Sequence, residues 1–103
     1  MVLKNDTIAK LLSTFSKLRI LVVGDVILDE FHWCEVNRIS PEAPVPICKV
    51  NTTTLSPGGA ANVAANIAAL NATVDICGFI GTDTTADKLI KTLKKQKIGI
   101  KGL

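Results

Sequence analysis

The sequence of 103 residues is poor in aromatic side chains, with no tyrosine, one tryptophan and three phenylalanines. Proteins that bind nucleic acids commonly interleave aromatic rings with basic residues, and that pattern is missing here. We therefore expect no nucleic-acid partner, although the formal net charge is +3. Half of the twelve cations lie in one C-terminal segment and are typical of a solvated helix face: Lys88, Lys91, Lys94, Lys95, Lys97 and Lys101.

Long apolar runs are also missing. The longest, residues 60–70, is interrupted by two asparagines, whereas a membrane-spanning helix needs about 20 apolar residues. Residues 1–17 predict an amphipathic helix, with Asn5 or Asp6 as N-cap, rather than a signal peptide or membrane anchor. We therefore expect no membrane partner. The apolar positions of this helix recur at helical spacing: Ile8, Leu11, Leu12 and Phe15.

The three cysteines are an odd number, and their spacings match no disulfide framework. Without an export signal before them, they favour a protein of the reducing cytoplasm. His32 and Cys34 would share one face of a strand and could begin a metal site with Cys48 and Cys77. Because neither a CxxC pair nor a second histidine is present, we assign no metal ligands.

What the chain does contain is an ordinary globular composition, with 48% hydrophobic and 20% charged residues. Apolar strand-like runs alternate with helical patterns, which predicts right-handed βαβ crossovers in a parallel sheet. Two shorter strands outside this alternation, 31–36 and 45–50, flank a proline-containing turn and predict a ribbon that covers one face. The alternating elements are a strand at 19–24, a helix at 60–70, a strand at 73–79, a helix at 84–95 and an extended segment at 98–103.

A parallel sheet with only these strands needs further elements to cover both faces, so we expect the chain to be part of a larger domain. The carboxyl ends of parallel strands usually form the ligand site. Here those ends carry Asp25, Asp29 and Asp83. Each also has a structural interpretation, since an aspartate after a strand is often a turn residue or a helix cap.

The glycine pair Gly58-Gly59 opens directly onto the next helix, whose first turn contains Asn62. Glycines allow close approach to the backbone, and a helix N-terminus offers unpaired N–H donors. The pattern favours a site for a sugar or a phosphate. The alternative is a tight turn followed by an ordinary polar helix residue.

Four motifs occur in the order found in ribokinase-like (PfkB-type) sugar kinases, and the resemblance covers residues 18–103. Within that family, the second motif is most similar to bacterial D-glycero-D-manno-heptose-7-phosphate kinase domains. The resemblance implies one α/β unit over 1–103: a partial ribokinase-like parallel sheet with flanking helices, an N-terminal helix at 1–17 and a small β lid at 31–50. The motifs are Gly24-Asp25-Val26-Ile27-Leu28-Asp29, Arg38-Ile39-Ser40-Pro41-Glu42-Ala43-Pro44-Val45-Pro46, Pro57-Gly58-Gly59-Ala60-Ala61-Asn62-Val63-Ala64 and Gly78-Phe79-Ile80-Gly81-Thr82-Asp83.

By motif match, the resemblance implies that Asp29, Gly58, Gly59 and Asn62 bind sugar hydroxyls. A carboxylate accepts hydroxyl hydrogen bonds, backbone amides donate to sugar oxygens, and an asparagine side chain does both. The lid would close over the sugar, exclude water and form a homodimer interface. Arg38, in the lid, would contact the phosphate of a sugar phosphate substrate or instead pair with Glu42.

The family places its catalytic aspartate, anion hole and nucleotide pocket in a C-terminal half, so we assign no catalytic base, cofactor-binding or metal-binding residue here. ATP and a divalent cation such as Mg²⁺ are expected in the intact enzyme, and residues 1–103 alone are expected to be inactive. Two alternatives remain: another ribokinase-like sugar or nucleoside kinase, and a non-catalytic sugar-binding or dimerisation module. Exposed Phe31, Trp33 and Ile47 would favour the module.

Overall fold

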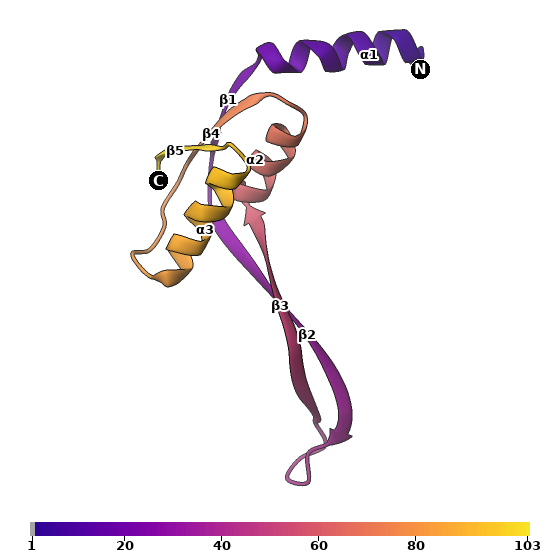
Figure 1. Cartoon of the computed structure of the whole chain (residues 1–103), viewed down its shortest axis with the longest axis vertical. Helices are drawn as coiled ribbons and strands as arrows, with labels where there is room; N and C mark the ends of the chain where they lie inside the picture. The colour runs from indigo at the N-terminus through magenta and orange to yellow at the C-terminus, as the bar shows by residue number, and fades with distance from the viewer. Residues whose placement is uncertain (1) are drawn as a thin grey trace.

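The computed structural model describes residues 2–103, so the expected helix start at Met1 lies outside the described residues. The predicted α/β class, with a parallel sheet and flanking helices, is confirmed (Figure 1). In this part of the chain the elements are α1 (Asn5–Thr14), the 3-10 turn η1 (Phe15–Lys17), β1 (Arg19–Val23), β2 (Val26–Ile39), β3 (Pro46–Gly59), α2 (Ala60–Ala69), β4 (Thr73–Cys77), α3 (Thr84–Lys95) and β5 (Gly99–Gly102).

The sheet has the strand order β1-β4-β5 with both pairings parallel, as the alternation of strands and helices predicts. Arg19 lies opposite Thr73 at one end of the β1–β4 ladder, and Val23 lies opposite Cys77 at the other. β4 ends two residues earlier than predicted. Gly78 still donates its N–H to the Gly102 carbonyl of β5, and the next side chain, Phe79, is 99% exposed.

The core lies between the sheet and helices α2 and α3. Val74 and Ile76 alternate along β4 and are both buried, so they point to the same face. Both helices pack on that face. Each large aliphatic side chain buried there contributes about 1.5–3 kcal/mol. The buried cluster consists of Ala61, Ala64, Val74, Ile76, Leu89, Leu93 and Ile98.

The opposite face of the sheet is open in residues 2–103. Leu21 and Val23 of β1 are 62% and 70% exposed. Their ladder partners Asp75 and Cys77 are half-buried. Most parallel sheets have both faces covered.

Helix α1 forms within the predicted N-terminal segment but projects from the rest of the molecule (Figure 1). None of Asn5–Thr14 is buried. The N-cap is Lys4, whose side chain makes no capping hydrogen bond, so the assignment of Asn5 or Asp6 was wrong. Lys4 has extended backbone angles and its carbonyl accepts from Thr7 and Ile8, which starts the helix one residue early.

Strands β2 and β3 form an antiparallel hairpin that extends away from the sheet (Figure 1). We call residues 26–59 the hairpin arm. Each strand has 14 residues, so the predicted strands 31–36 and 45–50 were too short. No glycine or proline interrupts β2 between Val26 and Ile39. The ladder between β2 and β3 therefore continues to the base of the arm, where Val26 pairs with Gly59. Residues 30–54, which we call the outer arm, extend away from the sheet and do not cover a face of it, contrary to the prediction.

Cys34 and Cys48 form a disulfide across the hairpin arm, with Cα atoms 5.6 Å apart. The conclusion that the cysteines match no disulfide framework was therefore wrong. Spacing along the chain did not reveal the pair because strand pairing, with a register shift between Trp33 and Cys34, brings the two residues together. Cys77 is a free, half-buried cysteine in β4.

Candidate functional site

The three parallel strands end at one edge of the sheet, and backbone hydrogen bonds continue beyond them. Gly24 N–H donates to the Cys77 carbonyl at 3.2 Å, and Gly78 N–H donates to the Gly102 carbonyl at 3.1 Å. A hollow of about 290 Å³ lies at this edge, lined in part by Asp25 and Phe79. The sheet edge therefore brings together segments from the first and last of the four sequence motifs.

The start of α2 is tied to the end of β1 through Gly59. Its φ of 54° lies in the region that favours glycine, and the next residue, Ala60, donates its N–H to the Asp25 carbonyl at 2.8 Å. A Cβ at position 59 would lie 2.5 Å from that same carbonyl oxygen. Gly59 thus allows the close approach that joins the arm, the sheet and α2. The structural alternative for the glycine pair was a tight turn, but both glycines lie at the end of β3, which leads directly into α2.

Asp29 and Gly58 come together at the base of the hairpin arm. A Cβ at Gly58 would lie 2.5 Å from Oδ2 of Asp29, so the carboxylate lies directly against the glycine backbone. Gly58 is buried whereas Asp29 is exposed. Among residues 2–103 no hydrogen bond or ion pair occupies this carboxylate. An exposed carboxylate with free acceptor positions can receive hydroxyl hydrogen bonds.

Asn62 lies in the first turn of α2, as predicted, and its side chain is exposed. Its Oδ1 accepts a hydrogen bond from Nδ2 of Asn66 at 3.3 Å, and its backbone carbonyl accepts from the same nitrogen at 2.9 Å. This contact orients the Asn62 amide. Sequence reasoning treated Asn66 only as an interruption of an apolar run, although its i+4 spacing on a helix was the available signal.

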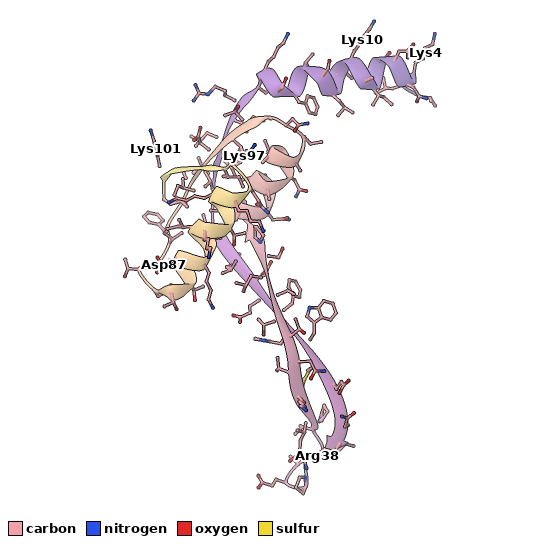
Figure 2. The ribbon with its side chains drawn as sticks, in the orientation of Figure 1. Lys4, Lys10, Arg38, Asp87, Lys97 and Lys101 are labelled. Atoms are coloured by element: carbon pink, nitrogen blue, oxygen red, sulfur yellow. A yellow bond between two sulfur atoms is a disulfide. The ribbon has the colours of Figure 1, made fainter. Side chains whose placement is uncertain are left out.

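Arg38 is not brought together with the other candidate residues. It lies near the far end of the hairpin arm (Figure 2), nine residues along β2 from Asp29. At the rise of a β-strand this separation is roughly 30 Å. Arg38 and Lys49 line a groove there, and within residues 2–103 no ion pair joins Arg38 to Glu42.

Asp83 has the structural role that the sequence left open. Its Oδ1 accepts a hydrogen bond from Ala86 N–H at 2.8 Å and caps α3. Asp25 contributes its backbone carbonyl to the start of α2, as described above. Neither residue has an arrangement that marks it as a catalytic base.

A metal site was not assigned from the sequence, and the described residues contain no group of three or more His, Cys, Asp or Glu side chains placed to hold an ion. In residues 2–103 no helix is long and apolar enough to span a membrane.

Comparison with known proteins gives relatives over most of the chain. It is 51% identical over 89 residues to the bifunctional protein HldE of Shewanella amazonensis and 52% identical over 89 residues to that of Shewanella baltica, in each case 86% of this chain. It is 51% identical over 84 residues to HldE of Haemophilus influenzae, 82% of this chain. The chain spans 18% of the length of these relatives.

The family model for pfkB family carbohydrate kinases matches residues 17–103. This range includes the sheet, its two helices and the entire hairpin arm. It also includes all four motifs on which the resemblance rests. The chain therefore belongs to the pfkB family of carbohydrate kinases.

Proposed function

We propose that the intact protein transfers the γ-phosphoryl group of ATP to the anomeric hydroxyl of D-glycero-D-manno-heptose 7-phosphate, in ADP-heptose synthesis for the lipopolysaccharide core. Residues 1–103 would supply the sugar-binding part of the kinase domain. The observation that carries this proposal is the exposed Asp29 carboxylate lying against Gly58, next to the start of α2. The heptose assignment is supported by the motif from Arg38 to Pro46 and by the identity to HldE proteins.

Asp29 would accept hydrogen bonds from two sugar hydroxyls, because a carboxylate offers two oxygens. Gly58 would contribute to the sugar site by letting the Asp29 carboxylate lie against the backbone, and Gly59 would let α2 begin at the site. The Asn62 amide would donate to a sugar oxygen from the side not occupied by Asn66. The roles of Asp29 and Asn62 rest on side chains that are exposed in the described part of the chain.

Arg38 is proposed to bind the phosphate of the sugar phosphate substrate. Because roughly 30 Å of strand separates it from Asp29, this contact requires either bending of the hairpin arm or an arm supplied by a second copy of the chain. A guanidinium group suits a phosphate because it donates in a fork geometry. Lys49 lines the same groove, and its charge is balanced by that of Glu35, which lies opposite it in the ladder.

ATP and Mg²⁺ are proposed to bind to parts of the enzyme other than residues 2–103. In these residues no group of three or more His, Cys, Asp or Glu side chains is placed to hold an ion. The catalytic base is proposed to lie with them. We also propose a cytoplasmic location, where ATP and phosphorylated sugars are available.

The exposed arm favours a second function for this chain, dimerisation. Phe31 and Trp33 are 51% and 62% exposed on the same face of β2, and Ile47 is half-buried. Exposed apolar groups of this kind mark interaction surfaces. A homodimer joined through the arms is compatible with the kinase proposal, and it is also what a non-catalytic sugar-binding module would form.

The proposal is tested by measuring ATP-dependent phosphorylation of heptose 7-phosphate by the full-length gene product. We expect activity on this substrate, with a lower kcat/KM on other sugars and on nucleosides. Asp29→Asn is expected to lower kcat/KM by about 100-fold, because two charge-assisted hydrogen bonds become weaker neutral ones. Residues 1–103 alone should be inactive.

The control is Asp6→Asn, which removes the same charge from the exposed helix α1. A preferred sugar other than heptose 7-phosphate would replace the substrate assignment and leave the kinase assignment intact. A full-length product that dimerises but phosphorylates no sugar or nucleoside would instead favour the non-catalytic module.

A further inference from the structure

The disulfide between Cys34 and Cys48 has no role in the proposed sugar site. It lies in the outer part of the hairpin arm, with 14 residues of sequence separation between its ends. Both cysteines are exposed, so small thiols and disulfides in solution can reach them. Cys77, by contrast, is free and half-buried in the sheet.

Apart from the ladder between β2 and β3 and side-chain contacts across it, such as that of Trp33 with Thr54, little packing supports the outer arm. Between Asp29 and Leu55, every described residue is exposed except Ser40 and Ile47, which are half-buried. The strand register also shifts twice, between Trp33 and Cys34 and between Val36 and Arg38. A two-stranded hairpin without a packed face is only marginally stable in water.

The disulfide closes the segment 35–47, which contains the second register shift, the proline-containing turn and Arg38. A cross-link of this kind restricts the open states of the loop that it closes. The order of the outer arm should therefore depend on whether the two sulfur atoms are bonded.

We propose that Cys34 and Cys48 are a reversible redox site. As the disulfide they hold the outer arm in register, and as two thiols they release segment 35–47 to fluctuate. The inference does not depend on the kinase proposal, because it concerns only the arm and its cysteines.

The oxidant is a small disulfide such as oxidised glutathione. The thiolate of one cysteine attacks a glutathione sulfur, which forms a mixed disulfide and releases one glutathione thiolate. The second cysteine thiolate then attacks the first cysteine's sulfur and releases the other glutathione. Two cysteine protons are lost and two electrons pass to the glutathione disulfide, giving two reduced glutathione molecules. Reduced glutathione reverses both steps.

The test uses the full-length protein equilibrated in glutathione buffers of different redox ratio. Peptide mass spectrometry after digestion without reductant should find a Cys34–Cys48 cross-linked peptide whose yield rises and falls reversibly with the ratio. Hydrogen exchange of amides in segment 35–47 should become roughly 10- to 100-fold faster on reduction. Exchange in β4 and α3 should not change.

Two variants separate this site from a general effect of reductant. In Cys34→Ser, exchange of segment 35–47 should be fast at every redox ratio, whereas Cys77→Ser should respond like the unmodified protein. The proposal is overturned if both thiols remain alkylatable at every ratio, if the cross-link includes Cys77, or if exchange in 35–47 is unchanged when the disulfide is reduced. None of these readouts requires kinase activity. A failure of the redox proposal can therefore be distinguished from a failure of the kinase proposal.

Discussion

At the scale of single residues, Gly59 is the position where the backbone leaves least freedom for substitution. It combines a φ of 54° with a carbonyl oxygen 2.5 Å from the place of a Cβ. Gly59→Ala should lower the free energy of unfolding by about 1–3 kcal/mol, because the backbone is strained and the Asp25 carbonyl must move. Urea denaturation of the full-length protein measures this loss.

Gly81→Ala is the matched control for that substitution. Its added Cβ would lie 3.4 Å from the Asp83 carboxylate, an ordinary contact, and its φ does not lie in the glycine-favoured region. We expect a change within about 0.5 kcal/mol. Equal losses in the two variants would contradict the special role of Gly59.

Single residues also show which contacts can be predicted from the sequence. Asp83 was named as a possible cap from its place before a helical pattern, and the cap is present. Such signals are local, because cap and helix are neighbours in sequence. The contact between Asp29 and Gly58 instead depends on how two strands pair. The sequence did not predict this contact. The family resemblance implied only that both residues bind the sugar.

At the scale of elements, the hairpin arm exposes two large aromatic side chains, Phe31 and Trp33, that a binding partner would cover. Trp33 donates its indole N–H to the hydroxyl of Thr54 at 3.1 Å, which holds the ring on the arm while most of it stays exposed. If the proposed dimer forms through the arms, Trp33→Ser should weaken dimerisation by at least about tenfold. Sedimentation of the full-length protein at several concentrations measures the effect.

Leu12→Ser provides the comparison on another exposed apolar element, since Leu12 of α1 is 48% exposed. The dimer should tolerate this change. If Leu12→Ser dissociates the dimer and Trp33→Ser does not, the interface involves α1 rather than the arm.

The elements differ in how well their sequences predict them. Helix α3 occupies the predicted residues because its apolar spacing and its cap agree. The arm was underestimated mainly at its base, because residues 51–59 of β3 are largely polar and include a proline and two glycines, a composition typical of loops. Their pairing is a property of two segments together, as are the register shifts and the disulfide that join them.

At the scale of the whole molecule, stability depends on one cluster between the sheet and its two helices. Leu93 is completely buried in it, whereas Leu70, after the end of α2, is 47% exposed. Leu93→Ala should lower the free energy of unfolding by about 2–5 kcal/mol, because it leaves a cavity. Thermal or urea unfolding of the full-length protein, with Leu70→Ala as control, measures the difference. A similar loss in both variants would contradict this assignment of the core.

The hairpin arm leaves and rejoins the rest of the molecule at one place. Val26 pairs with Gly59 at its base, and Ala60 N–H donates to the Asp25 carbonyl at 2.8 Å. The two ends of the arm are thus adjacent. A hairpin of another length could therefore replace the arm in an engineered protein without altering the path of the chain from β1 into α2, at the cost of the functions proposed for the tip.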